Sequence, residues 1–69
     1  MKKGDYLIKR GSEKIYIIVG RWDKDIVLAD TAEDSEEILI YGAAELEGLI
    51  SIGSFGKLYK TGIEIKKEV

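Results

Sequence analysis

Carboxylates are the residues of this 69-residue chain that could most readily do chemistry. Nine of the thirteen Asp and Glu residues fall between Asp23 and Glu47, where Lys24 is the single base. Paired carboxylates act as general acid and base in some hydrolases, but only when a pocket desolvates one partner and shifts its pKa. The acids here lie in segments typical of solvated turns, so we expect no catalytic pair among them.

Other catalytic and metal-binding groups are missing from the sequence. The chain has no His and no Cys, which removes the usual nucleophile and base pairs and the common zinc ligands. The acidic stretch does not follow EF-hand spacing, and no glycine-rich phosphate motif occurs. We therefore predict a non-enzymatic protein with no catalytic residue, metal, cofactor or small-molecule substrate. The loop of residues 30–37 is expected to be solvated and to protect a strand edge.

The charge is unevenly distributed along the chain. Residues 23–47 carry a net charge of −8, residues 1–22 carry +4 and residues 48–69 carry +2, although the total is only −2. Since the first and last strands of a barrel usually lie together, we expect one acidic side and one basic side. The basic side should hold most of the aromatic residues, and the acidic side should attract a basic partner.

Short β-branched and aromatic runs, separated by Gly or charged turns, predict a mainly-β protein. In the longest expected strand, one apolar set alternates with another, which indicates a strand buried on both faces or bent across a barrel. The first set is Ile15, Ile17 and Val19, and the second is Tyr16, Ile18 and Trp22. A bulge or corner is expected near residue 20, which is glycine. The six expected strands are residues 5–9, 14–22, 26–29, 37–41, 57–60 and 63–66.

Residues 36–50 have two interpretations. Residues 38–41 have strong β character, and glycines at positions 42 and 48 count against one long helix. Leu39, Ala43, Leu46 and Ile50 nevertheless keep helical spacing, and Asp34 is a suitable helix cap. We prefer a strand followed by a short helical turn over residues 43–50. The alternative is an α+β fold with a helix over residues 36–50 packed on a small sheet.

These elements predict one domain over residues 1–69: an SH3-like small barrel of five or six short antiparallel strands with one helical turn. A chain of this size buries only about 60% of its unfolded surface. The longest apolar run is too short to span a membrane, and the N-terminus lacks the apolar segment of a signal peptide. We expect a cytoplasmic protein. The Ile- and Lys-rich composition suggests an accessory protein of a bacterium or phage.

The function class most compatible with these features is a small interaction module that binds a protein partner or self-associates. An open barrel leaves strand edges and aromatic surface for a partner strand or peptide. Tyr and Trp are the preferred anchors of protein interfaces. The candidate protein-binding residues are Tyr6, Trp22, Tyr41 and Tyr59.

Nucleic-acid binding is the alternative function. Small barrels bind single-stranded nucleic acid by stacking nucleobases on aromatic residues above a basic groove. Most Lys and Arg residues of this chain lie outside the acidic stretch. The sequence pI of about 5.1 argues against this role, because dedicated nucleic-acid binders usually have a pI above about 9. The candidate nucleic-acid-binding residues are Lys9, Arg10, Lys14, Arg21, Lys57 and Lys60. A variant of the protein-binding function is mimicry, in which the acidic side of this protein occupies the nucleic-acid-binding cleft of a partner.

Overall fold

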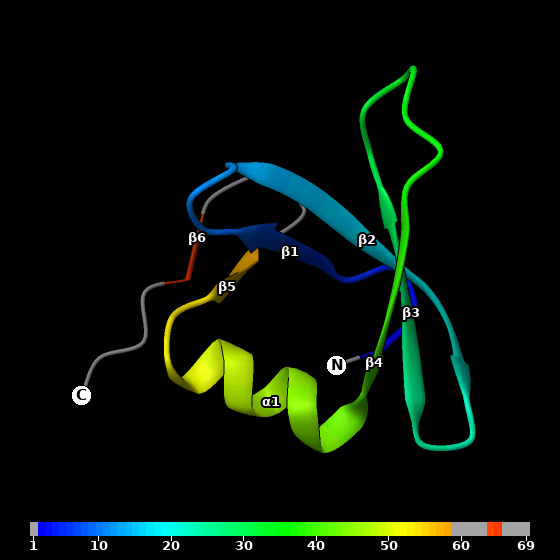
Figure 1. Ribbon diagram of the computed structural model, residues 1–69, viewed down its shortest axis with the longest axis vertical. Helices are drawn as coiled ribbons and strands as arrows, with labels where there is room; N and C mark the ends of the chain where they lie inside the picture. Colours follow the sequence, from blue (N-terminus) through cyan, green and yellow to red (C-terminus); the bar gives the residue numbers. More distant parts are fainter. Residues whose placement is uncertain (1, 59–63, 66–69) are drawn as a thin grey trace.

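The part of the chain that the structure describes forms one antiparallel sheet with one short helix. The computed structural model describes residues 2–58 and 64–65 (Figure 1). Its elements are β1 (Tyr6–Lys9), β2 (Lys14–Trp22), β3 (Asp25–Asp30), β4 (Ile38–Gly42), α1 (Ala43–Ser51), β5 (Phe55–Leu58) and β6 (Glu64–Ile65). The strand order is β4-β3-β2-β1-β5-β6. The mainly-β class with one short helix is thus confirmed. Over the described residues the sheet is open, with β4 and β6 at its two edges.

The helix covers one side of the sheet. Figure 1 shows β3 and β4 running along the long axis of the view, β1 and β5 crossing it, and α1 lying below β1 and β5. α1 contacts β3, β4 and β5. Its fully buried residue, Leu46, packs into a cluster with side chains from four strands. The other buried members of this core are Leu7, Tyr16, Ile18, Ile26, Leu28 and Phe55.

A bulge divides β2 into two halves. Ile18 pairs with Leu28 and Gly20 pairs with Val27, so Val19 is an extra residue on the β2 side. A bulge of this kind bends the strand and reverses which face the residues beyond it occupy. The expected bulge near residue 20 is confirmed. Of the two alternatives for this strand, burial on both faces is wrong, since Ile15 and Val19 stay 38% and 41% exposed. The bulge instead agrees with a bent strand.

The segment after the acidic loop contains a strand and then a helix, so the single helix over residues 36–50 is wrong. β4 occupies Ile38–Gly42, and α1 begins at Ala43. Gly42 has an extended backbone, with φ −61° and ψ 147°, and acts as the helix N-cap. The β-branched residues Ile38 and Ile40 favour the strand, and pairing with β3 supplies the hydrogen bonds that a helix would otherwise provide.

The fifth strand begins two residues earlier than expected. Phe55 and Gly56 precede the expected strand 57–60, but they pair with Lys9 and Ile8 of β1. Phe55 is 2% exposed, and its ring packs edge-on against Tyr16 and Tyr41 at centroid distances of 6.3 and 5.7 Å. Burial of this aromatic ring therefore outweighs the turn tendency of its glycine neighbours.

The part of the chain that the structure describes contains no helix with the length and apolar character needed to span a membrane.

Truncating the helix residue in the core should destabilise the fold. Leu46→Ala removes a side chain with no exposed surface, and we expect a loss of about 2–5 kcal/mol in the free energy of unfolding. Urea denaturation followed by circular dichroism measures it. The control Glu47→Ala changes the next residue, which is exposed, and should cost less than about 0.5 kcal/mol. Equal midpoints for the two variants would contradict this view of the core.

Candidate functional site: an apolar outer sheet face

The side of the sheet that faces away from α1 is also apolar; we call it the outer face. Paired residues of adjacent strands point to the same face. Tyr6, Ile17, Ala29 and Ile38 form one row of such pairs across β1, β2, β3 and β4. Neighbouring pairs extend the surface on both sides of this row. The apolar side chains that these pairings place on the outer face are Tyr6, Ile8, Ile15, Ile17, Trp22, Val27, Ala29, Ile38, Ile40 and Leu58, and Asp25 lies there opposite Trp22. The unpaired bulge residue Val19 follows the inward-facing Ile18, so alternation along the strand places it on the same side.

Much of this face is in contact with solvent. Ile38 and Ile40 are 52% and 62% exposed, and Trp22 is 73% exposed. α1, the helix of the described residues, lies on the opposite side of the sheet. Scattered exposed apolar residues are ordinary, but a contiguous apolar surface on a small domain usually marks a binding site.

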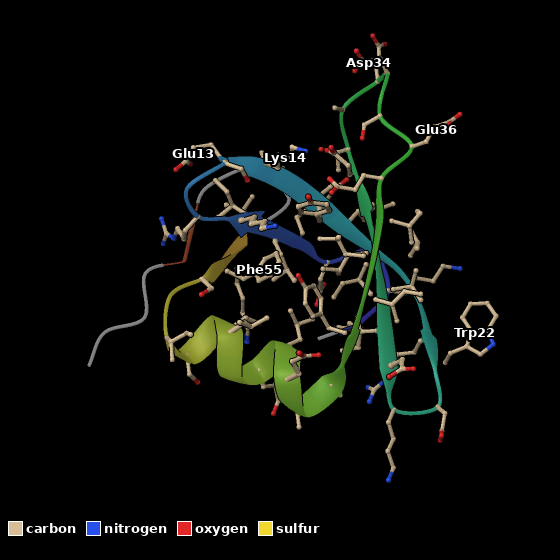
Figure 2. The ribbon with its side chains drawn as sticks, viewed as in Figure 1. Glu13, Lys14, Trp22, Asp34, Glu36 and Phe55 are labelled. Atoms are coloured by element: carbon tan, nitrogen blue, oxygen red, sulfur yellow. The ribbon has the colours of Figure 1, made fainter. Side chains whose placement is uncertain are left out.

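The bulge places Trp22 on the outer face. A regular β2 would put this residue on the same side as Tyr16 and Ile18, as the sequence alternation suggested. After the bulge, Trp22 instead pairs with Asp25 on the outer side. A Cβ atom built on Gly20 would lie 3.8 Å from the indole Cζ3 atom, so the ring lies over that glycine. Figure 2 shows the indole beside the β2–β3 hairpin, pointing away from the helix.

β4 contributes an open backbone edge next to this face. The Asp30 N–H donates to the Glu37 carbonyl at 3.1 Å, and the Ala43 N–H donates to the Lys24 carbonyl at 2.7 Å. In an antiparallel ladder every second residue bonds to the same neighbour. The peptide groups of Ile38 and Ile40 therefore point away from β3, toward the edge that no described strand occupies.

The acidic loop is tied to the sheet through Glu37. The Tyr16 hydroxyl donates to Glu37 Oε1 at 2.7 Å, and Lys14 Nζ donates to the same oxygen at 3.2 Å. The Thr31 N–H and Oγ1 both donate to the Ile15 carbonyl, at 3.0 and 2.9 Å. A carboxylate of the acidic stretch thus satisfies the only polar atom of a buried tyrosine side chain, which is a structural role.

These contacts shift the titration of three groups. Burial, together with the hydrogen bond to Glu37, raises the pKa of Tyr16 well above its ordinary value. The hydrogen bonds from Tyr16 and Lys14 hold the pKa of the Glu37 carboxyl below its ordinary value. The Ala32 N–H and the Ser35 hydroxyl lower the pKa of Asp30 in the same way. Neither carboxyl is poised as a proton donor near neutral pH, as an acid catalyst would need to be.

A second feature is an open hollow of about 530 Å³ near the C-terminal end of α1. Tyr41, Leu49 and Phe55 supply apolar surface, while Lys9 and Arg10 bring positive charge. The hollow lies on the helix side of the sheet, so it is separate from the outer face.

The structure distributes the predicted protein-binding residues over both sides of the sheet. Tyr6 is half-buried on the outer face, and Trp22 is exposed there. Tyr41 lies on the opposite side, where it packs against Phe55 and lines the hollow. Tyr59 lies outside the described residues.

The structure places Lys9, Lys14 and Lys57 on neighbouring strands and Arg21 apart from them. Lys9 pairs across the strands with Lys14, and Lys57 is on the strand beside them. Arg21 lies beyond the bulge, near the other end of β2. Lys14 also forms an ion pair with Glu37, so the expected separation of acidic and basic sides breaks down where the acidic loop meets β2. Lys60 lies outside the described residues.

Sequence reasoning missed Ile38 and Ile40 as candidate binding residues. Both belong to a run in which every residue of positions 38–41 is apolar. Such a run does not indicate which alternate set lies against the core. Leu39 and Tyr41 pack against the buried cluster, and this leaves the two isoleucines exposed.

Comparisons with protein-family models, curated proteins and solved structures found no match for this chain. Among residues 2–58 and 64–65, no three His, Cys, Asp or Glu side chains form a group that could hold a metal ion. The function must therefore be inferred from the chemistry of the outer face, the open edge of β4 and the hollow.

The contacts of Glu37 predict how stability depends on pH. Its pKa is lower in the folded state than its ordinary value of 4.5, so its stabilising contribution is complete above pH 4.5 and is lost as the pH falls through the folded value. Tyr16 has a raised pKa, so its contribution is complete below pH 10.0 and is lost at higher pH. Melting temperatures measured across these ranges should fall at both ends.

Two variants test whether Glu37 causes the fall in melting temperature at acidic pH. Glu37→Gln should flatten the fall in melting temperature on acidification. The matched control Glu33→Gln removes a charge from the same exposed loop without touching the Tyr16 hydroxyl, and should retain the fall due to Glu37. Identical acid limbs for the wild type and Glu37→Gln would show that this carboxylate does not carry the effect.

Proposed function

We propose that this protein is a non-enzymatic interaction module whose outer face binds a protein partner. The observation that carries the proposal is the contiguous apolar row across four strands, which Ile40 and then Trp22, at 62% and 73% exposure, extend toward the β2–β3 hairpin. Burying such side chains is favourable by about 25 cal/mol per Å² of apolar surface. Because the folded chain leaves these side chains in water, their burial supplies a driving force for association with a partner.

The composition of the outer face resembles the centre of a protein interface rather than an active site. Aliphatic side chains dominate it, and a large aromatic ring stands at its margin. Interface centres are depleted in charge and enriched in aromatic anchors. The exposed acids of the loop of residues 31–36 lie beside β4 and would favour encounter with a partner of positive charge.

Nucleic-acid binding is less well supported. Binding of single-stranded nucleic acid needs aromatic rings interleaved with Lys or Arg residues along one groove. Here the exposed indole belongs to a surface of aliphatic side chains, while Lys9 and Lys57 lie nearer the other end of the molecule. The ion pair between Lys14 and Glu37 further reduces the positive charge available to phosphates.

The proposed function uses the open form of the sheet. The SH3-like small barrel expected from the sequence is an open one, which leaves strand edges for a partner. The described pairings leave β4 and β6 at the margins, and an open edge beside an apolar face is a common arrangement for partner binding by strand addition.

Capture of partners by the immobilised protein from a lysate of the native host tests this proposal. The variant carrying Val19→Lys and Trp22→Ala changes two exposed residues of the outer face, and circular dichroism checks that it folds. We expect it to reduce the captured partner at least about tenfold, which corresponds to about 1.4 kcal/mol.

The control is Ile52→Lys, which changes a 75% exposed residue that lines the hollow at the C-terminal end of α1. It should capture the partner as the wild type does. If only the Ile52→Lys variant loses capture, the result would indicate that the partner binds at the hollow and not at the outer face. Equal capture by all three proteins would contradict any role for the outer face.

A further inference from the structure

We propose that β4 pairs antiparallel with β4 of a second copy of this chain, so that two sheets join edge to edge. The inference rests on the proposed function, because the paired strands carry the outer-face residues Ile38 and Ile40. Identical antiparallel strands are related by a two-fold axis, which closes the assembly as a dimer. The pairing would give the peptide groups of both residues the partners that they lack among the described residues.

β4 has none of the features that usually protect an exposed strand edge. Natural edge strands carry Lys, Pro or an inward-pointing charge that prevents further pairing. Ile38–Gly42 has the sequence Ile-Leu-Ile-Tyr-Gly, with no charged residue and no Pro. The outward side chains Ile38 and Ile40 are 52% and 62% exposed. Such an edge favours pairing with another strand over solvent.

The sequence of β4 selects a second copy as the partner strand. When Ile38 lies opposite Ile40 of the other copy, Leu39 lies opposite its own equivalent on the two-fold axis. Glu37 then faces Tyr41 of the other copy. A shift of the axis to residue 37 would place the two Glu37 carboxylates opposite each other, which is unfavourable. The strand is thus complementary to itself in a register that keeps the acids apart.

The pairing also extends the apolar surface. Ile38 and Ile40 are already paired with Ala29 and Val27 on the outer face. Edge-to-edge pairing places the outer faces of both copies on the same side of one continuous sheet. Contact between the four isoleucines would then add side-chain burial to the backbone hydrogen bonds across the new edge.

Sedimentation equilibrium of the full chain, from about 10 μM to about 1 mM, tests the proposal over the range in which small interfaces associate. The wild type should show a monomer–dimer equilibrium. Ile40→Lys places a charge on the pairing edge and should raise the dissociation constant at least about tenfold. The matched control Ile15→Lys changes an outer-face residue within β2 that is 38% exposed, and it should dimerise as the wild type does. A strictly monomeric wild type, or equal effects of both substitutions, would overturn the proposal.

Single cysteines test the register directly, because the chain has no cysteine of its own. In the proposed register, position 39 forms a non-hydrogen-bonded pair across the axis, with Cα atoms about 4.5 Å apart, which is within disulfide reach. The two copies of position 38 would be about 8 Å apart. Leu39→Cys should therefore form a disulfide dimer under mild oxidation, and Ile38→Cys should not. The reverse result would exclude this register.

These experiments fail independently of the partner-capture experiment. If the wild type is monomeric but the Val19→Lys and Trp22→Ala variant loses the captured partner, the proposed dimer is rejected and the proposed partner-binding function stands. If the wild type dimerises through β4 but neither it nor any variant captures a partner, the pairing of β4 stands and the binding of a different protein is rejected.

Discussion

The bulge in β2 is the feature on which the rest of the structure depends. One extra residue, Val19, lets the strand bend and reverses the facing of the residues beyond it. The first half of β2 can then place Tyr16 and Ile18 under the helix, while the second half sends Trp22 to the opposite side. The same bend directs β3 and β4 along a different axis from β1 and β5, which creates the concave side that α1 occupies (Figure 1).

A single helix of nine residues cannot cover a sheet that is apolar on both sides. Leu46 and its neighbours fill the concave side, where seven apolar residues are buried. The outer face has a similar aliphatic composition but no helix of the described residues against it. Because the hydrophobic effect is proportional to apolar area and not to sequence position, the uncovered side retains a driving force for association. This excess, rather than any reactive group, is what indicates the function.

The acidic stretch has two roles that net charge does not distinguish. Glu37 accepts hydrogen bonds from Tyr16 and Lys14 and so joins the start of β4 to β2. Other acids of the loop, such as Glu33 and Asp34, are exposed and act through their field. The loop that holds them enters β4 directly, so negative charge is concentrated at one end of the open edge. In the proposed dimer, this placement disfavours registers that bring the acids of the two copies together.

The sequence by itself determined the local order of this protein: the strand runs, the bulge near Gly20, the start of the short helix after Gly42 and the scarcity of catalytic groups. These features depend on propensity and alternation, which act over a few residues. Only the tertiary structure decided which apolar residues are covered. Alternation groups Leu39 with Tyr41 and Ile38 with Ile40, but it does not say which pair meets the helix. Burial is settled by strands distant in sequence that fold around Leu46, and that is why the exposed isoleucines became visible only in the folded chain.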